Sequence, residues 1–179
     1  MTFRITLSNQ TTYSMDATYL ALLRRAVRTV FRQSVKGDAY GSSVGPFERQ
    51  KFHIDIAIVD DRTSHRINVD FLGHDFPTDV ISFALDDDGS TLEGELVVNI
   101  QYATRSAQEY GWPPAHELLL YVIHGSLHLV GYDDHTETDR DKMRLAERRV
   151  LESLRIPIPP TMPQSPEFRG PAPSTSDSH

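Results

Sequence analysis

Residues 124–135 read HGSLHLVGYDDH and directly follow an apolar helical run at residues 118–123. Side chains four residues apart on a helix differ by about 40° in direction and about 6 Å in rise, so His124 and His128 can direct their imidazoles at one point. Gly131 can adopt the left-handed conformation that ends a helix and turns the chain back, which can bring His135 or Asp134 to the same point. Three such ligands leave a fourth tetrahedral position for water, so the stretch predicts a catalytic site for one zinc ion at the end of one helix.

The spacing of the three histidines resembles the H-E-x-x-H-x-x-G-x-x-H signature of metzincin peptidases. Gly125 stands where those enzymes have their general-base glutamate, and a glycine cannot accept a proton. An isolated pair such as His124 and His128 is also common on ordinary helix faces, and the third histidine is what favours a metal site. The pattern therefore predicts metal binding but argues against a peptidase.

Composition limits the chemistry that such a site can use. The chain has no cysteine, which excludes disulfides, thiol nucleophiles and thiolate zinc sites, so imidazole and carboxylate must supply the ligands. Its net charge of −7 argues against a strongly basic nucleic-acid coat, although a local basic face can still contact phosphates. No long apolar run and no export signal stand out, so we expect a cytoplasmic protein without a membrane span.

The 179 residues, 39% of them apolar, are enough for one sizeable core, and we expect a single domain over residues 1–155. Period-two and helical apolar patterns alternate along it, and residues 36–50 read as a loop. Thr63 or Ser64 is the expected cap of the second helix. The predicted strands are 3–7, 52–58, 80–85 and 95–100, the last two forming a hairpin, and the predicted helices are 16–33, 63–72, 101–110, one that opens near Pro113, and 136–154.

The end of the chain has a different composition. Residues 156–179 are rich in proline and serine and contain few large apolar residues. Such a segment cannot bury enough apolar surface to offset its ordering entropy, so we expect a disordered tail.

The segment 124–135 most closely resembles the hallmark H-G-x-L-H-L-x-G-Y-D-H of the YbeY family of bacterial endoribonucleases and ribosomal RNA maturation factors. FPTDVISF at residues 76–83 is similar to the family's P-T-D-V-L-S-F, and GEL at 94–96 is similar to its G-D-I, so that residues 3–154 fit as a whole. The resemblance implies an α+β fold in which a mixed four-stranded sheet packs with about five helices. It also implies one Zn²⁺ ion and hydrolysis of single-stranded RNA.

The same resemblance implies a role in 3′-end maturation of small-subunit (16S) ribosomal RNA and in ribosome quality control. Ribosomal RNA and the small ribosomal subunit would then be the partners, and the oligomeric state stays open. Two other interpretations remain: a ribosome-associated zinc-binding factor without nuclease activity, and a metzincin-like metallohydrolase acting on another substrate.

Two positions depart from the family pattern. The family has its third histidine directly after the aspartate of G-Y-D-H, whereas this chain has Asp133, Asp134 and then His135. We predict His124, His128 and His135 as the ligands, because a surface turn accommodates an extra residue and neutral imidazole suits zinc; Asp134 is the alternative.

The second departure is Leu72, which stands where the family usually has an arginine and cannot replace its charge or hydrogen bonds. Other arginines of the chain could substitute for it, although a solvated helix face is the simpler explanation of each one taken singly. They are Arg62, just before the predicted second helix, Arg66 within it, and Arg25, Arg28 and Arg32 in the first helix.

Three more carboxylates are candidates for the site. Glu95 could face the metal cleft or a ribosomal protein, or be an ordinary strand carboxylate. Asp79 most commonly would serve as a cap or in a turn, and its match to the family segment also makes it a candidate for the site. Asp133 could accept an imidazole N–H and so orient a ligand.

Overall fold

The computed structural model describes residues 1–35, 51–87 and 90–159, and this part of the chain forms four strands and five helices. The predicted α+β fold, with one mixed sheet and five helices, is confirmed. In chain order the elements are β1 (Thr2–Asn9), α1 (Ala17–Val35), β2 (Lys51–Val59), α2 (Asp61–Leu72), β3 (Val80–Asp87), β4 (Thr91–Asn99), α3 (Ile100–Tyr110), α4 (Pro114–Leu129) and α5 (Glu137–Leu154).

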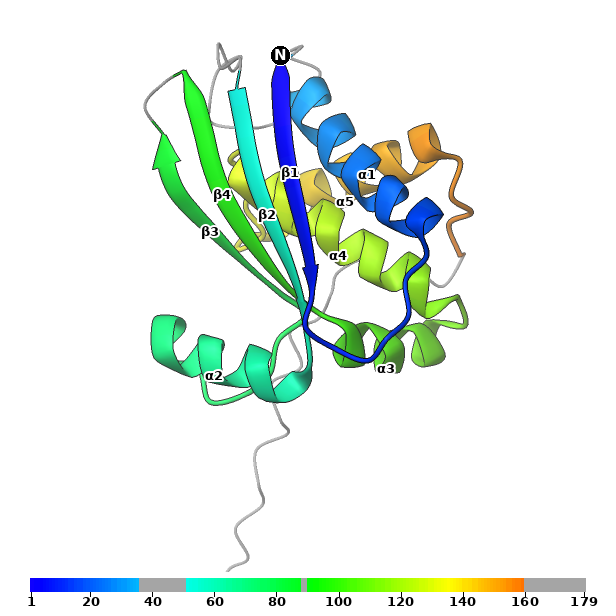
Figure 1. Ribbon diagram of the computed structural model, residues 1–179. Helices are drawn as coiled ribbons and strands as arrows, with labels where there is room; N and C mark the ends of the chain where they lie inside the picture. Colours follow the sequence, from blue (N-terminus) through cyan, green and yellow to red (C-terminus); the bar gives the residue numbers. More distant parts are fainter. Residues whose placement is uncertain (36–50, 88–89, 160–179) are drawn as a thin grey trace, which may run out of the picture.

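The strands are ordered β1-β2-β4-β3 across the sheet. The pairs β1–β2 and β2–β4 are parallel, and β3 returns antiparallel to β4 as the predicted hairpin. Helices α1, α4 and α5 lie together on one face of the sheet, while α2 packs at one end near β3 and β4 (Figure 1). The edge strand β3 and the C-terminal part of α4 are in contact, which places the histidine segment at that edge.

The core lies between the sheet and its helices. The period-two pattern of β2 buries Phe52, Ile54, Ile56 and Ile58, each at most 1% exposed. Helix α4 is the central helix: it contacts α1, α3, α5, β3 and β4, and most of its residues are buried. A helix enclosed on so many sides holds its side chains firmly, and this is the helix that carries the two histidines.

The start of α2 differs from the prediction. Asp60 is the cap, because its Oδ1 accepts a hydrogen bond of 2.8 Å from the backbone N–H of Thr63. A cap at Thr63 or Ser64 was therefore wrong. The buried Ser64 hydroxyl instead donates to the carbonyl oxygen of Thr78 at 2.9 Å and ties α2 to the segment before β3.

Two sequence predictions fall outside the described residues: the loop at 36–50, and the tail except for residues 156–159. Both stay predictions. Among the residues that are described, no helix has the length and apolar character that crossing a membrane would require.

Candidate metal centre

His124 and His128 meet through their Nε2 atoms, which lie 3.0 Å apart with the rings at 87° to each other. The opposite nitrogen of each ring is held by the protein. His124 Nδ1 lies 2.7 Å from a carboxylate oxygen of Glu147 on α5, and His128 Nδ1 lies 3.0 Å from the carbonyl oxygen of Tyr132. Because Nδ1 donates in each case, both Nε2 atoms are directed at one point, as the spacing predicted.

The turn after α4 adds a carboxylate to this pair. Gly131 has φ 91°, the left-handed conformation expected of it. Asp133 Oδ1 then accepts the backbone N–H of Asp134 at 2.7 Å and that of His135 at 3.3 Å, which tightens the turn. The result places Asp134 Oδ2 at 3.7 Å from His124 Nε2 and 4.0 Å from His128 Nε2.

His135 is not brought to the two helical histidines. Its side chain is 86% exposed, and its Nε2 lies 3.5 Å from Asp133 Oδ1 on the outside of the turn. With Asp133 and Asp134 it forms a second, more exposed group of possible ligands. The structure thus gathers His124, His128 and Asp134 into one cluster, and the predicted third ligand stands apart from it.

The cluster fits a divalent transition metal. Two imidazole nitrogens and a carboxylate oxygen are ligands that zinc accepts, and two Zn–N bonds of about 2.0–2.1 Å at a tetrahedral angle put the nitrogens about 3.3 Å apart. The observed Nε2–Nε2 distance of 3.0 Å is close to that value. Three protein ligands would fill three of the four positions of a tetrahedral zinc site.

The electrostatics of the pair favour one positive charge between the two rings. Burial disfavours a charged His124, but the hydrogen bond and negative charge of Glu147 outweigh it and raise the pKa of His124 to about 9. Burial and the neighbouring His124 lower the pKa of His128. One ring therefore accepts positive charge while the other stays neutral, and a metal cation competes with a proton for the same position.

Glu147 is a residue that sequence reasoning missed. It is 2% exposed and lies on the buried face of α5, which also carries Met143 and Val150. The sequence did contain a signal for it: Glu147 falls at helical spacing among the apolar residues of α5. A carboxylate on a buried face requires a charged or hydrogen-bonding partner, which here is His124.

Removing the charge of Glu147 is expected to weaken metal binding. Glu147→Gln keeps the shape and can still accept from His124 Nδ1, but loses the charge that makes the imidazole a better ligand. We expect the dissociation constant for Zn²⁺ to rise about 10-fold to 100-fold, measured by competition with a chelating dye. Glu152→Gln, on the exposed side of α5, is the control. Equal affinities of both variants would contradict a role for Glu147.

Gly125 lies between the two histidines, where α4 approaches the sheet closely. Its carbonyl oxygen accepts from the Ser82 hydroxyl at 3.1 Å. A Cβ at this position would lie 2.9 Å from Ser82 Oγ, 2.9 Å from Val80 Cγ2 and 3.0 Å from Leu96 Cδ2. The site therefore has no room here for the glutamate of a metzincin peptidase.

The other candidate carboxylates have different surroundings. Asp79 Oδ1 accepts from the Thr78 hydroxyl and from the backbone N–H of Val80, so it caps the start of β3. Asp133 holds the turn through backbone N–H groups and orients neither His124 nor His128.

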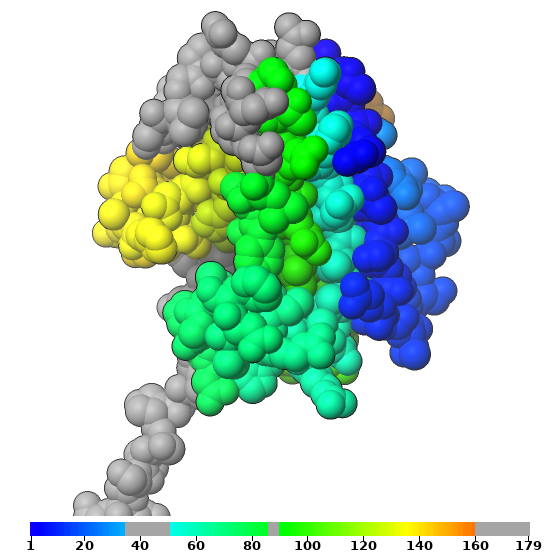
Figure 2. Space-filling view, turned by 60° about the vertical axis from the view of Figure 1, so that its left-hand side comes forward, coloured from blue at the N-terminus to red at the C-terminus, as the bar shows by residue number. Residues whose placement is uncertain are grey.

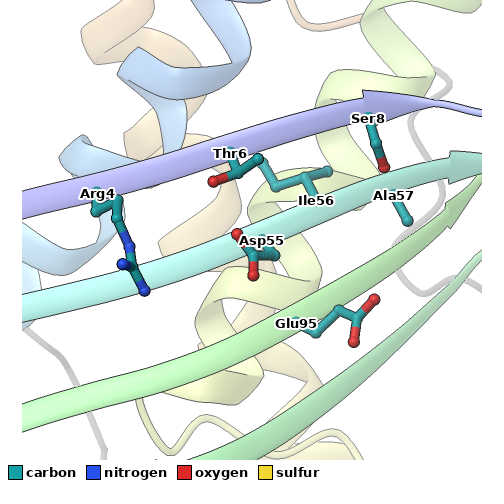
Figure 3. A pocket seen from close by; sticks show the side chains of 7 residues that line it. All are labelled: Arg4, Thr6, Ser8, Asp55, Ile56, Ala57 and Glu95. Carbon is teal, nitrogen blue, oxygen red and sulfur yellow. The ribbon is translucent and has the colours of Figure 1, made fainter.

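Glu95 lies on the sheet face away from α4, because its neighbours Gly94 and Leu96 contact α4. With Arg4, Thr6 and Asp55 it lines an open hollow of about 400 Å³ there (Figure 3). It does not face the metal cluster.

The region of Leu72 is exposed and partly apolar. Leu72 is 50% exposed and Phe71 is 69% exposed, and the Phe71 ring packs edge-on against Phe83 of β3 at 5.4 Å. Arg62 and Arg66 are exposed on the same helix, α2. Helix α1, which carries Arg25, Arg28 and Arg32, lies beside β1, at the other edge of the sheet from β3 (Figure 1). Its arginines are therefore poorly placed to replace the missing one.

The fold and the site together define a class: an α+β protein in which a central helix and the following turn present a histidine–carboxylate cluster that could bind a metal ion. Residues 8–155 match the family model described as Endoribonuclease YbeY. The chain therefore belongs to the YbeY family.

Relatives agree with this assignment, and a solved structure shares the fold. The chain is 45% identical over 108 residues to an endoribonuclease YbeY of Rhodopirellula baltica, a match that covers 59% of this chain and 56% of that protein. It is 34% identical to one of Desulforamulus reducens, over 75% of this chain and 88% of the relative. The solution structure of TM1509 from Thermotoga maritima, at 24% identity and TM-score 0.53, covers 94% of this chain and 100% of its own and shows the same fold.

Proposed function

We propose that this protein is a zinc-dependent endoribonuclease that cleaves single-stranded RNA. The observation that carries the proposal is the cluster of His124, His128 and Asp134, held from behind by Glu147, within the segment that resembles the family hallmark. Membership of a family described as endoribonucleases supports a hydrolytic nuclease role. We further propose that the substrate is the 3′ end of small-subunit (16S) ribosomal RNA in the cytoplasm, and that the protein serves ribosome quality control.

We propose His124 Nε2, His128 Nε2 and Asp134 as the metal ligands. The chemistry that a bound divalent ion supplies is polarisation of a phosphodiester oxygen or activation of a water nucleophile. Glu147 and the carbonyl of Tyr132 fix the tautomers of the two histidines, so that each presents Nε2. The negative charges of Glu147 and Asp134 offset part of the cation's charge, while the exposed side of the turn leaves access for a polynucleotide.

Cleavage of single-stranded ribosomal RNA by purified protein is the direct test. Native protein is expected to cut, and His128→Ala is expected to lose at least about 100-fold in rate, because one ligand of the ion is gone. Chelation should abolish cleavage and added Zn²⁺ should restore it. Mass analysis of the new ends distinguishes water attack from attack by the RNA's own 2′-hydroxyl, which leaves a cyclic phosphate.

A ribosome-associated zinc-binding factor without nuclease activity is the second candidate. Leu72 favours it, since the exposed end of α2 offers an apolar side chain where a phosphate clamp is expected. Equal cleavage by native protein and His128→Ala, matched for folding, would point to a contaminating nuclease and favour this second candidate. A peptidase is disfavoured by the lack of space at Gly125.

A further inference from the structure

Helix α1 carries a basic face that the metal centre does not use. It contains four arginines and no acidic residue, in a chain whose net charge is −7. Arg25, Arg28 and Arg32 follow one another at spacings of three and four residues, so they form a stripe along one side of the helix. Arg25 and Arg32 are exposed, and Arg28 is half-buried.

These three guanidinium groups are not neutralised by the described part of the chain. No ion pair joins Arg25, Arg28 or Arg32 to a carboxylate among residues 1–35, 51–87 and 90–159. The guanidinium carbon of Arg32 lies 5.7 Å from the centroid of the Phe3 ring, a cation–π contact that does not neutralise its charge. Like charges three and four residues apart disfavour a helix, and an anionic partner would relieve that repulsion.

The position of this stripe separates it from the cleavage site. Helix α1 lies beside β1, whereas the metal cluster lies beside β3, with β2 and β4 between these two edge strands (Figure 1). Figure 2 views the molecule from the β3 side. The blue α1 lies at its right-hand edge, and the yellow segment, which contains the end of α4 and the start of α5, lies on the opposite side of the green β3. A domain of this size has a radius of gyration of about 15 Å, so only an extended ligand can contact both places.

We propose that Arg25, Arg28 and Arg32 form a second, sequence-independent contact for the phosphate backbone of RNA outside the segment that is cut. A polyanion with evenly spaced charges fits a row of arginines about 4.5 Å and 6 Å apart along the helix axis. This inference rests on the proposed function, because RNA is the polyanion that an endoribonuclease meets. The contact would hold a long RNA without reading its bases.

The test compares binding of long and short RNA at several salt concentrations. The probes are fluorescent single-stranded RNAs of about 6 and about 40 nucleotides, since one small binding site covers about 4–16 nucleotides. In the full-length chain, Arg25→Gln with Arg28→Gln should weaken binding of the long RNA on the order of 10-fold and reduce the slope of log affinity against log salt by about 1.4. Binding of the short RNA should change less than twofold.

Two exposed cations on other elements provide the matched control, Lys51→Gln with Arg148→Gln, which removes the same charge. This control should leave the salt slope within half a unit of native. An equal loss of affinity for long RNA in both double variants would show that only the net charge matters, and it would overturn the proposal. Unchanged binding of long RNA by the variant with Arg25→Gln and Arg28→Gln would also overturn the proposal. The arginine stripe would then face solvent or bind an acidic protein partner. Binding is measured separately from cleavage, so a protein that binds long RNA through α1 but cuts nothing would refute the proposed function alone.

Discussion

Asp134→Ala is expected to lose tight metal binding, while His135→Ala keeps it. Asp134 Oδ2 lies within 4.0 Å of both ligand nitrogens, whereas the His135 side chain is 86% exposed on the outer side of the turn. Loss of a direct ligand should raise the dissociation constant for Zn²⁺ at least about 100-fold, more than the loss of a supporting hydrogen bond. Metal content after dialysis and dye competition measure the two variants side by side.

The Asp134→Ala variant should fold, because the turn is held by backbone atoms that this substitution keeps. The Asp134 N–H still donates to Asp133, and its carbonyl oxygen still accepts from Arg140 at 3.2 Å. Asp134→His is the rescue variant: it places an imidazole at the same position and should restore metal binding to within about 10-fold of native. Metal lost by His135→Ala and kept by Asp134→Ala would instead support the ligand set that the sequence suggested.

The helical half of the site could be predicted because a helix has fixed geometry. The spacing of His124 and His128 determines how their side chains lie, and nothing outside α4 is needed to bring them together. The third ligand depends on a turn, whose path is set by local hydrogen bonds. Asp133 accepts two successive backbone N–H groups there, and Thr136 caps α5 directly after His135, whose side chain is exposed.

The limits of the fold prediction have the same origin. Apolar periodicity and turn signals located the strands and helices, although β4 begins at Thr91 and not at residue 95, and family resemblance supplied the mixed sheet. The cap of α2 was misplaced because Ser64 bonds to Thr78, fourteen residues further along the chain. Glu147 was missed for a similar reason: its importance comes from His124 on another helix, a contact between distant parts of the sequence.

Gly125→Ala is expected to destabilise the protein and to weaken metal binding. Alanine in a helix interior gains up to about 1 kcal/mol over glycine from propensity. Here the new methyl group meets Ser82, Val80 and Leu96 at 2.9–3.0 Å, and overpacking a well-filled interior costs about 1–3 kcal/mol. The packing cost should exceed the gain, giving a net loss of roughly 1–2 kcal/mol and a Tm lower by about 2–8 °C.

To make room for the new methyl group of Gly125→Ala, α4 must shift away from β3 while α5 keeps its own contacts. This shift should move the two histidines relative to Glu147. Zinc affinity is then expected to fall on the order of 10-fold, as for other losses of ligand support. Ser126→Ala is the neighbouring control: it removes only a hydroxyl that donates to the Val122 carbonyl oxygen and should cost about 1 kcal/mol or less.

Val80→Ala combined with Gly125→Ala identifies the cause of the loss. Val80 Cγ2 is one of the two nearest atoms to the new methyl group, so its removal should recover part of the stability, and the two substitutions should couple favourably in a double-mutant cycle. Additive losses from the two substitutions would show that the space between α4 and β3 is not what requires a glycine at position 125. A Tm and a zinc affinity that both stay native in Gly125→Ala would show that β3 can move aside freely, and the close approach of helix and sheet would then not explain the missing glutamate.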